Sequence, residues 1–558
     1  MKRMFFAFLV LLQGFPAIAG FEPVYAGRGM VVSAEPNATL AGLQVLQQGG
    51  NAFDAAVAVG FALAVTYPAA GNLGGGGFLV ALTAAGKTIA LDFREKAPDA
   101  ATRDMYLGEK DEIIPQLSTD SFLAVGVPGT VHGLMRILED YGTLPRSDVL
   151  APAIRLAEEG FPVAYSLSRS LKQKETLEKL TRFPSTANVF YPGGQPPEFG
   201  GILRQTDLAH TLTAIREDGA AAFYEGAIAQ LIANHMRNNG GIITQEDLWA
   251  YSSKYREPFT FSHKNYQIIT HPVPSSGGVT LAQILQLLEP FPLRKMGYHS
   301  AKYVHLITEA ERLAFADRNH FLGDPDFVEV PDRALISEHY LQKRRTMIPQ
   351  NKAGNSMGVK HGHIEPCETT HYCVVDSRRN VVAVTYTLND SYGMGAVVEG
   401  AGFLLNNEMD DFSAKPGRPN LYGLIGAEAN AIAPGKRMLS SMTPTIVLKD
   451  NRFDFTMGSP GGPMIITTSL QIFLNITEMG MNIREAIDAR RFHHQWLPDI
   501  IEYEPFAFSP DTILKLRTMG YTMKEKESIG VAAGIQATED GLLAGYADGR
   551  GSGQALGY

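Results

Sequence analysis

A continuous apolar run at residues 55–67 predicts a long helix near the start of the chain. The run is rich in alanine and ends at Pro68, and Asn51 or Asp54 can cap its first turn. It is too short to cross a bilayer, which needs about 20 apolar residues. We therefore expect a helix that packs against a sheet inside a soluble protein.

Residues 78–93 predict a β-hairpin, because two strand-like runs flank a turn around residues 84–87. The tripeptide Gly86-Lys87-Thr88 matches the end of a phosphate-binding P-loop. However, Ala81 replaces the first glycine of that motif, and a strand follows where a phosphate cradle needs a helix. We therefore do not expect nucleotide binding.

Helical periodicity dominates residues 145–250 and returns over residues 300–318. Residues 351–368 are polar and aperiodic, which predicts an exposed loop, and strand-like sequence follows at once. The chain has no repeat period and no long linker. We therefore expect one large interleaved α/β unit.

The strand-like sequence after residue 368 predicts a second hairpin, with strands at 369–376 and 381–388 and a turn at 377–380. If the turn centres on Arg378, Thr369 stands opposite Thr387, and Asn389 lies on the same face. Cross-strand neighbours of this kind are about 4.5–5.5 Å apart at Cβ. A threonine at the first position of a strand would therefore have a hydroxyl and an amide beside it.

A threonine hydroxyl is a weak nucleophile unless a base removes its proton. No His/Asp arrangement for that task is visible in the sequence. The α-amine of Thr369 could serve, but only if the chain is cut before Thr369. From spacing alone, an ordinary threonine-rich hairpin is the expected alternative.

Residues 1–19 have the layout of a cleaved secretory signal, with basic residues, an apolar run at 4–12 and a small-x-small site at 17–19. Cleavage after Ala19 is expected, with Ala26 as the alternative. The protein is therefore expected to be exported, to the periplasm or the medium.

Composition excludes further classes of protein. The chain has 558 residues, a net charge of −9 and no basic run, which argues against nucleic-acid binding. It has 2 cysteines, Cys367 and Cys373, so a disulfide framework is excluded. The pair could be two free thiols or one local bridge, and a bridge would hinder a cut before Thr369.

Ten short motifs resemble the γ-glutamyltranspeptidase family, in the order in which that family carries them, from about residue 26 to the C-terminus. They are GNLGGGGF at 71–78, FRE at 93–95 followed by AP at 97–98, VPGTVHG at 127–133, PSSGG at 274–278, TTHYCVVD at 369–376, VTYTLN at 384–389, LLNNEMDDF at 404–412, LSSMTPT at 439–445, GSPGG at 458–462 and FHHQW at 492–496.

The resemblance implies an N-terminal nucleophile hydrolase with an αββα sandwich, made as one precursor that cuts itself between Glu368 and Thr369. Residues 20–368 would form a large subunit and residues 369–558 a small catalytic one. Thr369 would then be the nucleophile and its freed amine the base. Thr387 would hydrogen-bond the nucleophile, and the N–H groups of Gly461 and Gly462 would form the oxyanion hole.

The resemblance also implies a pocket for a zwitterionic γ-glutamyl group. Arg94 would clamp the α-carboxylate, with hydroxyl donors from Ser440 and Ser441. Three further residues, Asn389, Glu408 and Asp411, would accept from the α-ammonium group. Tyr422, in a lid at residues 416–427, would wall the pocket from solvent. Without the resemblance, Arg94 and Asp411 would be expected to be surface ion-pair partners.

The expected activity is γ-glutamyl transfer and glutathione hydrolysis through an ester on Thr369, with an amino acid, a peptide or water as acceptor. No cofactor and no metal are expected, although His361, His363, His371, His493 and His494 are suggestive on paper. Two alternatives stay open: a cephalosporin or glutaryl acylase of the same fold, and an unprocessed binding protein without enzymatic activity.

Overall fold

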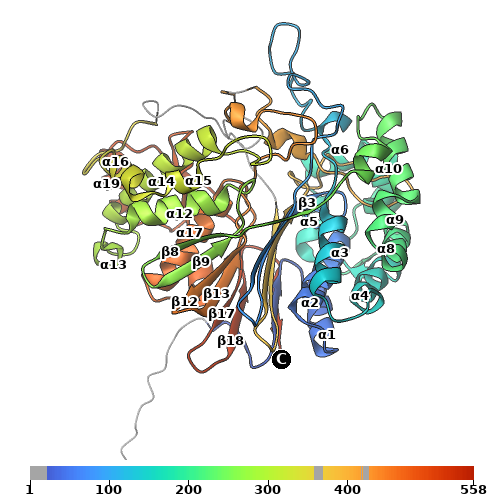
Figure 1. Cartoon of the computed structure of the whole chain (residues 1–558), viewed down its shortest axis with the longest axis horizontal. Helices are drawn as coiled ribbons and strands as arrows, with labels where there is room; N and C mark the ends of the chain where they lie inside the picture. Colours follow the sequence, from blue (N-terminus) through green and yellow to red (C-terminus); the bar gives the residue numbers. More distant parts are fainter. Residues whose placement is uncertain (1–21, 357–368, 416, 419–425) are drawn as a thin grey trace, which may run out of the picture.

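Two seven-stranded sheets lie face to face in the part of the chain that the computed structural model describes, residues 22–356, 369–415, 417–418 and 426–558. Helices cover the outer face of each sheet, so the layers run α, β, β, α (Figure 1). The predicted αββα sandwich is therefore confirmed.

The first sheet contains the hairpin of Thr369, and every pairing in it is antiparallel. Its strands, in spatial order, are β19 (Gln554–Gly557), β2 (Met30–Ser33), β10 (Thr370–Val375), β11 (Val381–Thr387), β3 (Gly76–Leu82), β4 (Thr88–Phe93) and β7 (Lys254–Arg256).

The second sheet is also antiparallel throughout. Its strands, in spatial order, are β1 (Val24–Ala26), β18 (Leu543–Ala547), β17 (Ala533–Ala537), β13 (Arg452–Gly458), β12 (Thr445–Lys449), β9 (Tyr266–Thr270) and β8 (Phe259–His263). Two small sheets lie outside the sandwich: β5 (Phe161–Pro162) with β6 (Ile202–Leu203), and β14 (Phe492–His493) with β15 (Ile501–Tyr503) and β16 (Met523–Glu525).

The helices divide between the two outer layers in chain order (Figure 1). The layer on the first sheet holds α1 (Pro36–Gln47), α2 (Ala52–Thr66), α3 (Thr130–Tyr141), α4 (Arg146–Glu158), α5 (Tyr165–Leu171), α6 (Lys174–Thr181), α7 (Pro184–Phe190), α8 (Thr206–Asp218), α9 (Ala220–Tyr224), α10 (Ala227–Asn238) and α11 (Gln245–Trp249). The layer on the second sheet holds α12 (Gly277–Leu288), α13 (Leu293–Met296), α14 (Ala301–Phe321), α15 (Asp332–Leu335), α16 (Glu338–Arg345), α17 (Met464–Thr477), α18 (Ile483–Asp488) and α19 (Pro510–Thr518).

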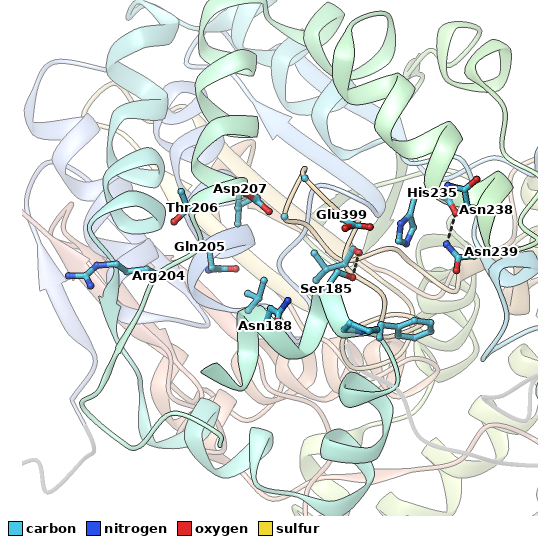
Figure 2. Close-up of a pocket in the computed structure, with 17 residues that line it drawn as sticks. Ser185, Asn188, Arg204, Gln205, Thr206, Asp207, His235, Asn238, Asn239 and Glu399 are labelled. Carbon is cyan, nitrogen blue, oxygen red and sulfur yellow. Dashed lines mark hydrogen bonds between the residues drawn. The ribbon is translucent and has the colours of Figure 1, made fainter. Parts of the chain in front are cut away.

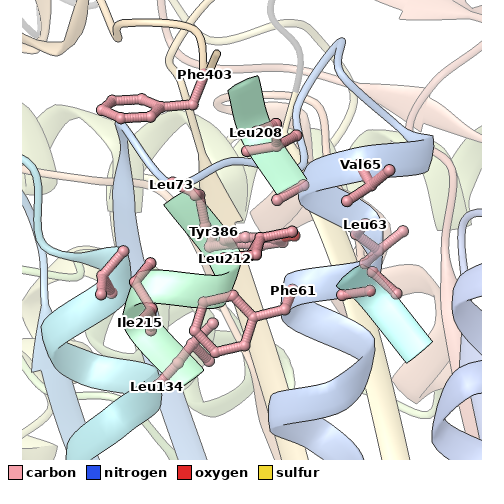
Figure 3. Close-up of a cluster of buried hydrophobic side chains, with 14 of the residues drawn as sticks. Phe61, Leu63, Val65, Leu73, Leu134, Leu208, Leu212, Ile215, Tyr386 and Phe403 are labelled. Carbon is pink, nitrogen blue, oxygen red and sulfur yellow. The ribbon is translucent and has the colours of Figure 1, made fainter. Parts of the chain in front are cut away.

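Helix α2 is the predicted apolar helix, and all its residues are buried. Asn51 and Asp54 both cap it, in a reciprocal capping box that satisfies two free N–H groups of the first turn. Its Phe61 and Leu63 pack with Leu212 of α8 and Tyr386 of β11 in the core between sheet and helices (Figure 3). The expectation that it packs against a sheet is confirmed.

The hairpin of β10 and β11 has the predicted register. Thr370 stands opposite Tyr386 and His371 opposite Thr385, which continues to Thr369 opposite Thr387. Side chains alternate between two cores, because successive residues of a strand point to opposite faces. Tyr372 lies in the core under the helices, whereas Cys373 lies in the core between the two sheets. By this alternation, Thr369 and Thr387 face the gap between the sheets.

Other sequence predictions have clear outcomes. The hairpin at 78–93 is β3 and β4, and Thr88 begins a strand, which confirms that the P-loop match is accidental. Residues 1–21 and 357–368, with the proposed signal and the bond before Thr369, lie outside the described residues. Among the residues described, no helix is long and apolar enough to cross a membrane.

Candidate active site

A small cavity opens at the end of the β10–β11 hairpin, between the two sheets, and has a free volume of about 20 Å³. It brings together residues that are up to 371 positions apart in the chain. Its lining consists of Arg94, Thr369, Thr387, Asn389, Glu408, Asp411, Ser440, Ser441, Met442, Gly462 and Ile465. Nine of these are among the eleven site residues expected from the sequence, and a tenth, Gly461, adjoins Gly462.

The hydroxyl of Thr369 donates to the hydroxyl oxygen of Thr387 over 3.5 Å. The backbone N–H of Asn389 donates to the same oxygen over 2.9 Å, and Asn389 has a left-handed backbone with φ of 80°. The turn after β11 therefore folds back onto Thr387. Both threonines are buried, at 5% and 3% exposure. A nucleophile in this position would be oriented by hydrogen bonds and protected from bulk water.

Gly461 and Gly462 lie in the turn between β13 and α17. Both have positive φ, 126° and 52°, which a residue with a Cβ rarely adopts. Among the described residues, neither backbone N–H donates to a protein acceptor. The turn directly precedes α17, a helix of 14 residues, whose N-terminus carries a partial positive charge. These N–H groups suit the charge that develops on a carbonyl oxygen.

Arg94 follows β4 and is fully buried among three carboxylates. Its guanidinium forms ion pairs with Glu408 and Asp411, and its Nη1 lies 3.5 Å from Oε2 of Glu95. Arg94 and Asp411 form the ion pair that would be expected without the family resemblance, but not at the surface, since their side chains are 0% and 11% exposed. The short 3-10 helix η4 (Glu408–Asp411) turns both acidic side chains inward.

Burial dominates the protonation of these carboxylates. It raises the pKa of Glu408 and of Asp411, and it raises that of Glu95 to about 7, against the attraction of Arg94. Burial also opposes the charge of Arg94, but Glu408, Asp411 and Glu95 together raise its pKa. Arg94 therefore stays charged. The excess of carboxylates over guanidinium suits a ligand that brings a cation.

Ser440 and Ser441 come from the segment before β12. Residues 274–278 hydrogen-bond the backbone of Ser440. The backbone N–H of Ser440 donates to the carbonyl of Pro274 over 2.9 Å, and its carbonyl accepts from the N–H and hydroxyl of Ser276 over 2.7 and 2.6 Å. Two motifs that are far apart in the sequence therefore form one rigid wall of the cavity.

Sequence reasoning missed two residues of the site. Glu95 lies behind Arg94, and Arg318 of α14 donates to the hydroxyl of Ser441 over 3.1 Å. Helix α14 also buries Glu311 and Arg312. Helical periodicity predicts this helix, but the pattern does not say which of the charged residues at 309–318 reach a cavity.

The remaining expectations concern the lid, the thiols and the histidines. Tyr422, Cys367, His361 and His363 lie outside the described residues, whereas Cys373 is a buried free thiol. Burial lowers the pKa of His371 to about 3. Its Nδ1 hydrogen-bonds Thr385 over 2.8 Å, and those of His493 and His494 contact Thr467 and the Trp496 N–H. No group of three His, Cys, Asp or Glu side chains in the described ranges is arranged to hold a metal.

A larger cavity, of about 780 Å³, lies among α7, α8, α10 and residues 397–402 (Figure 2). Its lining includes Asp207, His235 and Glu399, and Ser185 closes one wall by donating to the carbonyl of Val397 over 3.0 Å. None of the predicted site residues lines it. Cavity size alone would therefore have placed the site away from Thr369.

Several known proteins are similar to this chain. The family described as gamma-glutamyltranspeptidase matches residues 38–558. A glutathione hydrolase proenzyme of Escherichia coli (strain K12) is 48% identical over 533 residues, which cover 95% of this chain and 92% of that protein. A gamma-glutamyltranspeptidase structure from Helicobacter pylori matches with a TM-score of 0.58 and 44% identity, covering 62% of this chain and 97% of that one. A cephalosporin acylase structure from Bacillus halodurans matches with a TM-score of 0.85 and 27% identity, covering 99% of both chains.

Proposed function

The chain belongs to the gamma-glutamyltranspeptidase family, and on that premise we propose that Thr369 is its nucleophile. The enzyme is a gamma-glutamyltransferase and glutathione hydrolase that acts on γ-glutamyl compounds. The observation that carries the assignment of residues is the cavity that joins Thr369 to Arg94 and its carboxylates.

Maturation is proposed to occur between Glu368 and Thr369. The Thr369 hydroxyl attacks the Glu368 carbonyl carbon, the C–N bond breaks, and the acyl group moves from nitrogen to oxygen. Water then hydrolyses this ester, which leaves a free carboxylate on Glu368 and a free amine on Thr369. The antiparallel pairings of β10 with β2 and of β11 with β3 join residues 20–368 to residues 369–558. These pairings support the proposal that the two subunits stay associated.

In the mature enzyme, the Thr369 oxygen attacks the γ-glutamyl carbonyl carbon while the α-amine takes the hydroxyl proton through a water. The carbonyl oxygen becomes negatively charged beside the N–H groups of Gly461 and Gly462. The leaving amine takes the proton as its bond to the acyl carbon breaks. Water or an acceptor amine then attacks the Thr369 ester, and the threonine hydroxyl is restored. Thr387 holds the nucleophilic oxygen throughout.

The pocket is proposed to recognise both charges of the γ-glutamyl group. Arg94, Ser440 and Ser441 receive the α-carboxylate, since a guanidinium and two hydroxyls are donors that suit it. The second set, Asn389, Glu408 and Asp411, receives the α-ammonium. The cavity of about 20 Å³ holds about one water. Side chains that line the cavity must therefore move to admit a γ-glutamyl group.

Export, the lid and the acceptors complete the proposal. Residues 1–19 act as a secretory signal, cleaved after Ala19, and deliver the protein to the periplasm or the medium. Amino acids and peptides serve as acceptors. Tyr422 and the lid at 416–427 exclude water and so favour transfer over hydrolysis.

A glutaryl acylase is the competing function, because the cephalosporin acylase shares the whole fold. A glutaryl group carries a carboxylate but no ammonium. It would bring no cation to Glu408 and Asp411, which share the single guanidinium of Arg94, and buried carboxylates that outnumber their cation are costly. The three carboxylates around Arg94 therefore favour the γ-glutamyl donor.

The test is to separate the purified protein by denaturing electrophoresis and to sequence the N-terminus of the smaller chain. We expect two chains, with the smaller beginning Thr-Thr-His-Tyr, and release of p-nitroaniline from γ-glutamyl-p-nitroanilide. A Thr369→Ala variant should stay one chain and release none. A single persistent chain in the unmutated protein, or faster turnover of glutaryl-p-nitroanilide, would overturn the proposal.

A further inference from the structure

Arg318 is a buried guanidinium beside the candidate site, and no carboxylate of the described residues pairs with it. It lies in α14 and is 4% exposed. Its Nε, Nη1 and Nη2 donate to three neutral oxygens, those of Ser276, Asn319 and Ser441, at 3.0, 3.0 and 3.1 Å. Within the described ranges, no carboxylate oxygen comes within 4.0 Å of its nitrogens, whereas Arg94 has three such carboxylates.

An unpaired buried cation is costly, and neutral oxygens recover only part of the lost hydration. Burial lowers the pKa of Arg318 to about 10, with only Asp411 near enough to oppose this. The guanidinium therefore stays charged at neutral pH, and the part of the chain that the structure describes holds no carboxylate paired with it. Such a charge behind a ligand cavity is suited to attract an anion that arrives with the ligand.

The contact with Arg318 also decides which way the Ser441 hydroxyl points. A guanidinium has only donors, so the Ser441 oxygen must accept from it. The hydroxyl proton of Ser441 then has to point elsewhere, and among the described residues it donates to no protein acceptor. Ser441 lines the cavity with Arg94. Arg318 therefore holds Ser441 as a hydrogen-bond donor toward the cavity.

We propose that Arg318 is a positioning residue for the α-carboxylate of the donor. It orients the Ser441 hydroxyl as a donor and places a positive charge behind it. The α-carboxylate of the donor is thereby favoured at Ser441. This inference rests on the proposed function, and it makes Arg318 a determinant of specificity for donors that carry an α-carboxylate.

The experiment compares two chromogenic donors that differ only in this group. γ-Glutamyl-p-nitroanilide carries the α-carboxylate, and 4-aminobutanoyl-p-nitroanilide lacks it. Arg318→Gln should lower kcat/KM for the first donor by about tenfold to a hundredfold, mainly through KM, which is the range of a charge-assisted hydrogen bond. It should change kcat/KM for the second donor by less than about threefold. Arg318→Lys keeps the positive charge but not the forked geometry of the guanidinium. Its kcat/KM for the first donor should lie between those of the unmutated enzyme and Arg318→Gln.

A double-mutant cycle tests whether Arg318 acts through Ser441. Ser441→Ala alone should show the same selective loss for the carboxylate-bearing donor. In that background, adding Arg318→Gln should cost less than the single substitution costs, because their shared interaction is already gone. Full additivity of the two losses would remove the positioning role.

Arg344→Gln is the matched control, because it makes the same substitution in a guanidinium that contacts α14 away from the cavity. Arg344 pairs with Asp317, the neighbour of Arg318. The Arg344→Gln variant should have a lower midpoint of thermal unfolding, and its ratio of kcat/KM between the two donors should be unchanged.

Several outcomes overturn the inference while leaving the proposed function intact. They are equal losses on both donors in a processed Arg318→Gln enzyme, or the same change of ratio in Arg344→Gln. If Arg318→Gln fails to mature, an unchanged donor ratio in both Arg318→Lys and Ser441→Ala also overturns it. An unmutated enzyme that is processed but inactive on γ-glutamyl-p-nitroanilide would instead contradict the proposed function.

Discussion

Replacing Glu95 with glutamine is expected to stabilise the protein at neutral pH by an amount that grows between pH 4.5 and pH 7. The Glu95 side chain is 0% exposed, and both its oxygens lack a hydrogen-bond partner among the described residues. Its nearest cation, Arg94, already pairs with Glu408 and Asp411. Burial therefore raises its pKa to about 7, from an ordinary value of 4.5.

The sign and size of the effect follow from this shift. Between pH 4.5 and pH 7 the folded protein holds a proton on Glu95 that the unfolded chain has released. The stability of the unmutated protein therefore falls as the pH rises through this window, by about 1.4 kcal/mol per pH unit and about 3 kcal/mol in all. Glutamine does not titrate, so this loss is absent from the variant. Above pH 7 the difference between the two proteins becomes constant.

The assay is differential scanning calorimetry at pH 5.0 and pH 7.5, in a Thr369→Ala background so that one uncleaved chain unfolds. With an unfolding entropy of about 2.1 cal/mol/K per residue, 3 kcal/mol corresponds to about 3 °C in the midpoint for this chain. The unfolding midpoint of Glu95→Gln minus that of its parent should therefore be about 3 °C higher at pH 7.5 than at pH 5.0. Glu178→Gln is the control, since that side chain is 66% exposed. A gain that does not change with pH would refute the reasoning, because Glu95 would then be an ordinary ionised partner of Arg94.

Three further predictions address catalysis and specificity. Thr387→Val should lower kcat for γ-glutamyl-p-nitroanilide by about tenfold to a hundredfold with little change in KM, since the hydroxyl oxygen, fixed by the backbone N–H of Asn389, holds the nucleophilic hydroxyl of Thr369; a change confined to KM in steady-state kinetics would contradict this. Asp411→Asn should weaken the preference for γ-glutamyl over glutaryl donors by about tenfold or more, because it removes a partner of the α-ammonium; an unchanged ratio of kcat/KM values would show that Asp411 serves Arg94 alone. Deletion of residues 416–427 should raise the share of hydrolysis over transfer when products are quantified with glycylglycine as acceptor, and an unchanged product ratio would remove the water-excluding role of the lid.

The hairpin of Thr369 was predictable because its determinants are local. Strand propensity and turn position place Thr369 opposite Thr387 by the period-2 geometry of paired strands, and the structure has that register. The capping box of α2 was predictable for the same reason, since Asn51 and Asp54 act on their own helix. In both cases the interacting residues are fewer than 20 positions apart.

Motif matching identified residues of the cavity but not how they interact. The family resemblance places Arg94 and Asp411 at one site, but it does not predict that they form a buried ion pair with each other. Their burial depends on η4 meeting Arg94 at the end of β4, and these segments are more than 300 residues apart. Glu95 lies within a recognised motif, but its lack of hydrogen-bond partners depends on atoms contributed by other segments.

The sequence by itself determined the class of fold, the family and the hairpin that presents Thr369, because periodicity and motif order express local geometry and common descent. The tertiary structure alone decided which charges share one buried cavity. It placed Arg318 behind Ser441 and three carboxylates around Arg94. The physical reason is that desolvation and ion pairing depend on distances between segments far apart in the chain, and no local pattern of residues encodes those distances.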